Sequence, residues 1–228
     1  MEMLLFIIGI VIIYFIYQKG QFTFFTKIIF RGNDKEKIIA LTFDDGPQPP
    51  YTENILKVLN KNKILATFFL LGANIEKHPE SVKKIISENH EIGNHSYSHK
   101  KMLFKSPDFI QKEIQKTDEI LKTYKIETKI FRPPFGVGLL ILPFIVKLFK
   151  KNIIIWSINS KDYLGLSAEK ISERILRKIQ PGSIILMHDG SGVDSGNRSN
   201  TVETLKIIIP QLKKMGYKFS TISNLPLK

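Results

Sequence analysis

The chain has 228 residues, 43% of them hydrophobic, which suits one main globular domain with a substantial core. It contains no cysteine, so disulfides and thiolate ligands are excluded, and any metal must be held by histidine and carboxylate. Lysine and arginine outnumber acidic residues by 34 to 21, a net charge of +13, but the excess lysines are scattered over expected helix faces without interleaved aromatics. We therefore expect a solvated basic surface and no nucleic-acid partner.

The amino terminus is the first distinctive segment. Met3 to Tyr17 is an unbroken apolar run, a little shorter than the ~20 residues that a membrane helix needs. No basic stretch precedes it and no small-residue cleavage site follows it, which argues against a removed signal peptide. A buried core helix is the alternative, but such a helix would have to be enclosed on every side. We predict a transmembrane anchor over residues 1–20, a linker over 21–36 and one domain over 37–228.

From residue 37 onward, apolar strands alternate with helices of period near 3.6. The expected strands are 37–43, 66–71, 91–93, 129–131, 152–157, 183–187 and 218–222. The expected helices open near Thr52, at Pro79, at Ser106, near Gly138, at Ser167, and at Asn200, where Glu203 completes a capping-box-like start. This alternation predicts an α/β fold with a parallel sheet. Seven strands predict a closed or nearly closed (β/α) barrel.

Two adjacent carboxylates end the first of these strands. Asp44 and Asp45 follow the apolar run that begins at Ile38, and a Gly-Pro turn comes next. A metal-assisted hydrolase can use such a pair, because one carboxylate holds the metal while the other takes a proton from the attacking water. Asp-Asp-Gly is also a common turn sequence, so the pair alone favours a turn.

A second cluster changes that balance. His95 and His99 are four residues apart, a spacing that brings both imidazoles to one face of a helical turn. Imidazole suits zinc and its neighbours, and two histidines with a carboxylate leave an open position for water. The alternative is a polar loop with two incidental histidines, although the chain has only five. The spacing therefore favours a catalytic metal site.

Three further polar clusters follow expected strands. They are Phe131 to Gly136 (FRPPFG), Trp156 to Tyr163 (WSINSKDY) and Leu186 to Gly190 (LMHDG). Each has an ordinary explanation: a proline-stiffened loop, an Asx-type turn and a strand-ending turn. Their recurrence favours another interpretation, because the carboxyl ends of barrel strands converge on one catalytic face. We expect all five clusters to line one site.

With these motifs in this order, the sequence resembles the polysaccharide deacetylases, carbohydrate esterase family 4, over roughly residues 37 to 225. The matching segments are Thr42 to Pro47, His95 to His99, Arg132 to Gly136, Asn159 to Tyr163 and Leu186 to His188. The first, second and last are highly specific in combination. The resemblance implies a distorted seven-stranded barrel, similar to a TIM barrel, and makes residues 37–228 the catalytic domain.

The resemblance also implies individual roles. Asp44 would be the catalytic base, oriented by Arg132, and His188 the general acid, tethered by Asp162. The implied metal ligands are Asp45, His95 and His99; the Phe135 N–H would serve the oxyanion, and Tyr163 and Leu186 would wall the acetyl pocket. The chain departs from the family pattern twice, with Asn159 where Asp is frequent and Tyr163 where Trp is frequent. We expect these changes to alter pocket detail without removing activity.

The implied reaction is metal-dependent removal of N-acetyl groups from N-acetylhexosamine units of a polysaccharide, peptidoglycan or chitin-like, with release of acetate. Zn²⁺ is the expected ion, and Co²⁺, Ni²⁺ and Mn²⁺ are alternatives. Two rival functions stay open. One is hydrolysis of a small non-peptide amide on the same scaffold, and the other is a catalytically degenerate sugar-binding wall or sporulation factor.

Membrane orientation is predicted from two opposing arguments. Lys19, Lys27 and Arg31 follow the apolar run and only Glu2 precedes it, so the positive-inside tendency alone leaves the domain in the cytoplasm. The polymer substrates that the resemblance implies lie outside the membrane, and this argument has the greater weight. We expect a monomeric, single-pass cell-membrane protein whose catalytic domain lies outside the cytoplasm.

Overall fold

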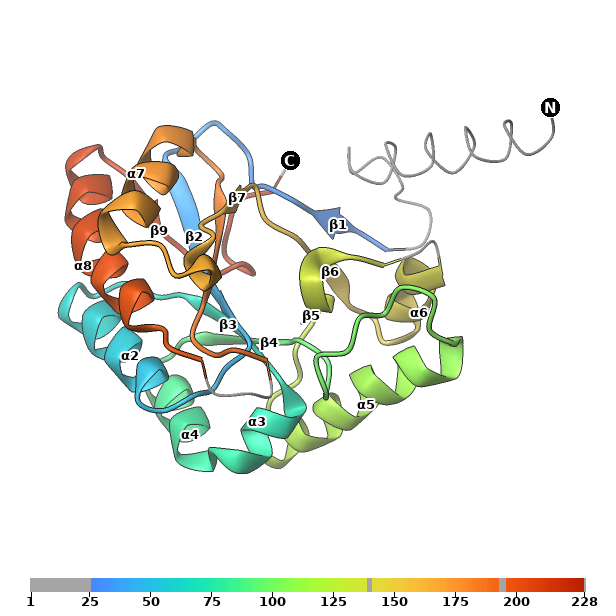
Figure 1. Ribbon diagram of the computed structural model, residues 1–228. Coiled ribbons are helices and arrows are strands. Elements are labelled where there is room, and N and C mark those ends of the chain that lie inside the picture. Colours follow the sequence, from blue (N-terminus) through green and yellow to red (C-terminus); the bar gives the residue numbers. More distant parts are fainter. Residues whose placement is uncertain (1–25, 139–140, 193–195, 228) are drawn as a thin grey trace.

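Figure 1 presents the computed structural model, which describes residues 26–138, 141–192 and 196–227. Its described strands form one nine-stranded sheet in which all ladders between named strands are parallel. The strands are β1 (Ile28–Ile29), β2 (Ile38–Asp44), β3 (Thr67–Leu70), β4 (Glu91–Asn94), β5 (Ile130–Phe131), β6 (Asn152–Ile154), β7 (Ile158–Asn159), β8 (Ile184–His188) and β9 (Lys218–Phe219). Their order is β1-β6-β5-β4-β3-β2-β8-β7, with β9 paired to β2.

The sheet curls toward itself. Strands β6 and β7 stand near opposite ends of the ladder order, yet only residues 155–157 separate them in the chain. Across this short segment, Ile155 N donates to Ile29 O at 2.8 Å and Ser157 N donates to Ile184 O at 3.0 Å. An isolated antiparallel bridge between Arg31 and Ser183 also joins the two ends. The predicted α/β fold with a parallel, barrel-like sheet is therefore confirmed.

The predicted count of seven strands is wrong for the described chain. The expected strand 152–157 is split into β6 and β7, because residues 155–157 cross from one end of the sheet to the other. Strand β1 lies within residues 21–36, the predicted linker, and pairs with β6. Strand pairing therefore begins earlier in the chain than the sequence suggested.

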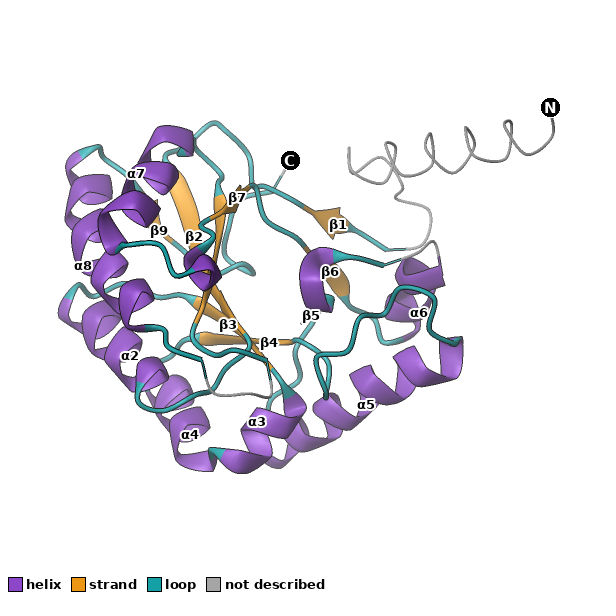
Figure 2. Cartoon of the chain, viewed as in Figure 1, coloured by secondary structure: helices purple, strands orange, loops and turns teal. Residues whose placement is uncertain are grey.

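Helices cover the outside of the sheet (Figure 2). They are α2 (Tyr51–Lys61), α3 (Gly72–Lys77), α4 (Pro79–Ser87), α5 (Pro107–Thr123), α6 (Ile141–Leu148), α7 (Ala168–Lys178) and α8 (Ser199–Lys214), with 3-10 turns η1 (Pro134–Gly136) and η2 (Asp162–Leu164). Ser106 and Ser167 cap α5 and α7 by accepting from the backbone N–H three residues on, as Ser does at helix starts. The short helix α3 was not predicted.

The capping box predicted at the start of α8 is wrong. Arg198 occupies the N-cap position and makes no side-chain capping bond. Asn200 lies inside the helix, and its Nδ2 donates to Leu166 O at 2.7 Å. Asn197 Oδ1 instead accepts from Ser199 N at 2.8 Å, so the turn before the helix binds its first amide.

The core explains which face of β2 carries polar groups. Ile39, Leu41 and Phe43 are fully buried in the cluster formed between the sheet and the outer helices. Ala40 belongs to a second cluster, formed with residues of other strands inside the curled sheet. Because side chains alternate along a strand, Thr42 and Asp44 share the inner face with Ala40. The sequence thus directs the first carboxylate into the interior of the sheet.

The predicted membrane anchor, residues 1–20, lies outside the described residues. Within residues 26–138, 141–192 and 196–227, no helix is both long enough and apolar enough to cross a membrane.

Candidate metal and catalytic site

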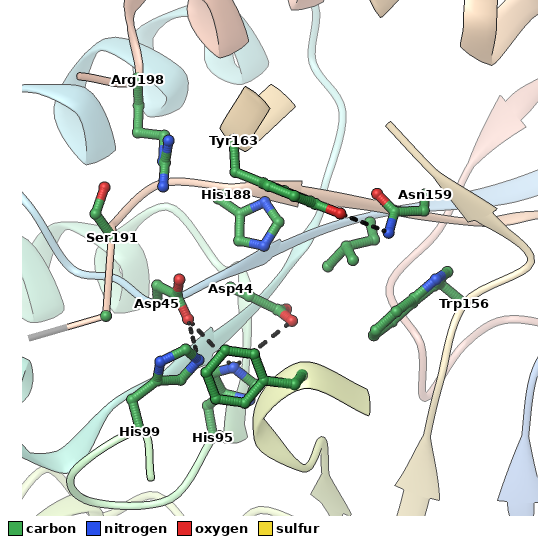
Figure 3. A pocket seen from close by; sticks show the side chains of 13 residues that line it. Asp44, Asp45, His95, His99, Trp156, Asn159, Tyr163, His188, Ser191 and Arg198 are labelled. Atoms are coloured by element: carbon green, nitrogen blue, oxygen red, sulfur yellow. Dashed lines mark hydrogen bonds and ion pairs between the residues drawn. The ribbon is translucent and has the colours of Figure 1, made fainter. Parts of the chain in front are cut away.

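The five predicted clusters meet at the carboxyl ends of the strands. Asp44 and His188 end the adjacent strands β2 and β8 and stand opposite each other in register. A cavity of about 420 Å³ opens there, shown in Figure 3. It is lined by Asp44, Asp45, His95, His99, Phe135, Trp156, Asn159, Tyr163, Leu186, His188, Ser191, Gly192 and Arg198. All the predicted site residues except Arg132 and Asp162 line this cavity, and those two lie behind its wall.

The three implied metal ligands converge on one point. Asp45 Oδ1 lies 3.0 Å from His99 Nε2 and 3.3 Å from His95 Nε2. One candidate ligand atom from each residue lies within 4.8 Å of the others. Asp45 and His95 are buried, whereas His99 is partly exposed toward the cavity. Two imidazoles and one carboxylate are a common donor set for a catalytic transition metal.

Hydrogen bonding fixes how His95 faces this point. Its Nδ1 lies 2.7 Å from Arg132 O, and since a carbonyl only accepts, Nδ1 carries the proton. Neutral His95 therefore presents the Nε2 lone pair to Asp45. A carbonyl that holds the distal nitrogen in this way is the usual support of a metal-binding histidine.

The carboxylate of Asp45 also fits a cation. Burial alone would raise its pKa, but hydrogen bonds from His95 and His99 hold the pKa well below its ordinary value, so the group is ionised. Its Oδ1 is buried and has no well-aligned hydrogen-bond donor among the described residues. An ionised, buried oxygen that faces an imidazole lone pair needs a positive charge between them. The residues present thus fit a divalent metal.

The predicted helical turn at the two histidines is wrong. His95 to His99 form a loop after β4, in which Ser96 and His99 take positive φ angles of 72° and 58°. The carboxylate of Glu113 on α5 holds the loop by accepting from the N–H groups of Tyr97 (3.1 Å) and Ser98 (2.8 Å). The four-residue spacing still brings both rings together, at 5.2 Å between centroids, but a distant carboxylate shapes the loop.

Arg132 holds the first carboxylate of the pair. Its side chain is fully buried, and Nη1 donates to Asp44 Oδ1 at 2.6 Å and to Thr42 Oγ1 at 2.8 Å. Nε and Nη2 donate to the carbonyls of Ile154 and Ile155 at 3.2 and 3.1 Å. Burial lowers the pKa of Arg132, and the charge of Asp44 opposes that shift. The guanidinium therefore fixes Oδ1 of Asp44 and leaves Oδ2 toward the cavity.

His188 is held by Asp162, as predicted. Asp162 Oδ1 lies 2.8 Å from His188 Nδ1, and Oδ2 accepts from the His188 backbone N–H at 2.8 Å. Burial alone would lower the pKa of His188, but Asp162, helped by Asp45 and Asp44, raises it to about 9. Ser160 and Thr201 also donate to Asp162, at 2.9 and 2.7 Å. Sequence reasoning missed both, because Thr201 comes from α8 and carries no local signal.

The two departures from the family pattern touch each other. Asn159 Nδ2 donates to Tyr163 Oη at 3.4 Å, so the hydroxyl that Tyr adds is matched by the amide that replaces a carboxylate. The Tyr163 ring packs edge-on to His188, 5.2 Å between centroids. Leu186 lies on β8 below it and is 3% exposed. The three side chains line the cavity beside His188 (Figure 3).

Phe135 lies on the other side of the cavity. Its backbone has a positive φ of 61°, and its half-exposed ring packs 4.7 Å from the ring of His99. Gly136 beside it also has a positive φ, 68°, and a Cβ there would collide with Trp156. A left-handed pair of residues thus turns the loop against Trp156, which only glycine permits at position 136.

Asp189 supports the carboxylate pair from below and was not predicted. It is fully buried, accepts from Thr52 Oγ1 at 2.7 Å, and would collide with any Cβ on Gly46. Burial, reinforced by the charges of Asp45 and Asp44, raises its pKa to about 7 even though Thr52 donates to it. The glycine after the carboxylates is therefore required by close packing against Asp189.

Comparison with known proteins gives a consistent result. The family model described as polysaccharide deacetylase matches residues 31–140. A peptidoglycan-N-acetylglucosamine deacetylase of Bacillus cereus is 40% identical over 200 residues, which are 86% of this chain and 70% of that protein. A peptidoglycan-N-acetylmuramic acid deacetylase of Bacillus subtilis is 35% identical over 204 residues, 85% of this chain and 73% of that protein.

Two solved structures have the same fold. One is a peptidoglycan N-acetylglucosamine deacetylase in complex with a 4-naphthalen-1-yl-N-hydroxybenzamide, with a TM-score of 0.83 and 38% identity over 87% of this chain and 92% of that one. The other is described as a pseudoenzyme of carbohydrate esterase family 4 from Bacillus anthracis, with a TM-score of 0.81 and 32% identity over 88% and 69% of the two chains.

Proposed function

This chain belongs to the polysaccharide deacetylase family, and we propose that it removes N-acetyl groups from N-acetylhexosamine units of a cell-wall glycan through a single metal site. The observation that carries the proposal is the site itself. A complete set of metal-ligand candidates, a buried carboxylate held by arginine, and a histidine held by aspartate meet in one cavity. The relatives that act on peptidoglycan support the choice of this polymer.

The residues divide the work of amide hydrolysis between two sides. Asp45, His95 and His99 would hold a divalent ion, which when bound makes water more acidic and the acetamide carbonyl more electrophilic. Asp44 Oδ2 is free to take the proton of the attacking water, because Arg132 occupies Oδ1. His188 Nδ1 is occupied by Asp162, so Nε2 gives its proton to the departing nitrogen. The C–N bond then breaks and yields acetate and a free amine.

The protonation of His188 suits this role. With a pKa of about 9, the imidazole is charged at neutral pH and holds the proton that the amine needs. An uncharged histidine would leave the poor amide leaving group without a proton donor. We assign the oxyanion contact to the Phe135 N–H, beside the candidate ligand His99, and the acetyl wall to Tyr163 and Leu186.

The first prediction concerns the ion. Purified protein is expected to contain roughly one equivalent of divalent metal per chain, most of it zinc, since imidazole and carboxylate suit Zn²⁺. The double variant His95→Ala with His99→Ala is expected to lose it, because only one of three ligands remains. Elemental analysis after dialysis measures both, with His78→Ala as the control. Unchanged metal content in the double variant would refute the ligand assignment.

The rivals differ in substrate and in catalysis. A small-amide hydrolase would release acetate from simple acetamides but not from glycans, and a degenerate wall factor would release none. The pseudoenzyme among the structural relatives means that the fold alone does not carry activity. Acetate release by the purified chain from peptidoglycan, chitin oligomers and a simple acetamide decides among them. We expect release from a glycan, whereas release from the acetamide alone would reject the proposal.

We further propose that residues 1–20 anchor a monomer in the cell membrane with the catalytic domain outside. The support is the apolar run without a cleavage site and the external location of the proposed polymer. Protease added to intact cells lacking an outer barrier is expected to digest the domain while a cytoplasmic marker stays intact. A domain protected until lysis would reverse the orientation and remove access to the wall.

A further inference from the structure

The wall of the cavity formed by the loop after β8 is cationic. Arg198 lines the cavity and points into it beside Ser191, above Asp45 and His188 (Figure 3). The residue is 9% exposed, and its Nε donates to Gly190 O at 2.7 Å. That bond holds the base of the guanidinium against the loop and leaves its outer nitrogens for other partners.

The guanidinium is weakly paired within the described part of the chain. Its only further hydrogen bond there joins Nη1 to Asn197 O at 3.5 Å, and no described carboxylate forms an ion pair with it. The Ser191 hydroxyl is also buried and has no described hydrogen-bond partner. A buried arginine and a buried hydroxyl without full partners are costly unless a ligand supplies an acceptor.

The charges around the cavity favour an anionic ligand. Asp44, Asp45 and Asp162 are opposed by Arg132 and by the protonated His188. A divalent ion at the candidate ligands makes this inner set positive, and Arg198 adds another positive charge at the rim. Negative charge on a substrate would therefore be stabilised at Arg198 rather than repelled by the carboxylates.

We propose that Arg198, assisted by Ser191, binds a carboxylate carried by the substrate sugar, such as the lactyl ether of N-acetylmuramic acid. A guanidinium pairs with a carboxylate through parallel N–H···O bonds, which a hydroxyl of a neutral sugar cannot reproduce. The site would then select a muramyl over a glucosaminyl unit. This inference rests on the proposed deacetylase function and names its preferred substrate.

The test compares two glycans that differ only in charge. One is a peptidoglycan fragment that retains its muramyl carboxylates, and the other is the same fragment with those carboxyls converted to neutral amides. Wild-type chain is expected to show a KM lower by about 10–100-fold for the charged fragment, the range typical of a hydrogen bond to a charged group. Equal KM values would overturn the inference.

Variants locate the effect. Arg198→Gln is expected to reduce the charged-to-neutral ratio of kcat/KM by about 10–100-fold, mainly through KM, and Arg198→Lys to restore part of it. Ser191→Ala should reduce the same ratio by a smaller factor, and it tests the subsite without removing the Gly190 contact. An equal loss on both fragments, with the ratio unchanged, would assign Arg198 to loop structure and overturn the subsite.

Two further measurements separate other sources. Asp194 lies outside the described residues, so Asp194→Asn is tested in parallel; a ratio unchanged from wild type is expected, and a drop matching Arg198→Gln would make that pairing the cause. Inhibition by acetate should respond little to Arg198→Gln, whereas a large rise in its inhibition constant with no change in the ratio would assign the guanidinium to the product. Absence of acetate from every glycan would instead reject the proposed function.

Discussion

Asp44→Asn is expected to retain the bound metal and to lose about 10²–10⁴-fold in kcat, whereas Asp45→Ala is expected to lose the metal. The two residues are adjacent and chemically alike, but their surroundings differ. Arg132 binds Asp44 Oδ1 at 2.6 Å, while His99 Nε2 and His95 Nε2 lie 3.0 and 3.3 Å from Asp45 Oδ1. An amide at position 44 keeps an oxygen for Arg132 but cannot accept a proton from water.

Metal content and acetate release should be measured on the same preparations of both variants. The matched control is Asp189→Asn, a neighbouring buried carboxyl that lines neither the cavity nor the ligand set. It tests whether any change near the pair disturbs the site. If Asp44→Asn and Asp45→Ala lose metal equally, the roles have been divided wrongly between the two carboxylates.

His188→Ala is expected to abolish most amide hydrolysis and to spare hydrolysis of an activated acetyl ester. An amine leaves only with a proton, whereas an aryloxide leaves without one, so the general acid matters for the first reaction and little for the second. Metal content should be unchanged, because His188 is not in the candidate ligand set. Equal losses on amide and ester would show that His188 does not act as the acid.

Asp162→Asn should move the alkaline limb of the pH–rate profile to lower pH. Asp162 raises the pKa of His188 above its ordinary value of 6.5 to about 9, so the acid is protonated below that pH and lost above it. Without the carboxylate, burial is opposed only by the more distant Asp45 and Asp44, and the pKa falls. A bound divalent ion lowers both limbs further but keeps their order. A limb that stays in place in Asp162→Asn would contradict the tether.

The strand that carries the carboxylates could be predicted because its signal is local. Ile38 to Phe43 is an apolar run that ends in polar and turn residues, and the observed β2 ends one residue later, at Asp44. Its alternation also explains why Asp44 shares the inner face with Thr42, where Arg132 binds both. The convergence of five clusters followed from parallel strands whose carboxyl ends meet.

Elements that depend on distant partners could not be predicted. The two-residue strands β1 and β7 have no periodicity of their own and exist because β6 and β8 pair with them. The histidine loop was predicted as a helical turn from spacing alone, but Glu113 on α5 sets its conformation. A carboxylate sixteen residues from Tyr97 in the chain leaves no mark within the motif.

The supporting residues of the site were missed for the same reason. Thr201 donates to Asp162 from α8, 39 residues away, and Asp189 holds the Gly46 turn through a contact with no sequence spacing to suggest it. The Asn159–Tyr163 pair is different, since both positions were noted as departures in one motif. Their hydrogen bond shows that the two changes are coupled, which sequence comparison of single positions does not reveal.

The central claim is tested most directly by mass spectrometry of a defined N-acetylated peptidoglycan fragment incubated with the full-length chain and one equivalent of Zn²⁺. The account predicts loss of a single acetyl group at a modified sugar, with an equal amount of acetate released and the glycosidic bonds intact. Asp44→Asn with its metal retained should leave the fragment unchanged. Acetate release that persists in Asp44→Asn, or an unchanged fragment with the metal-loaded wild-type chain, would contradict the account.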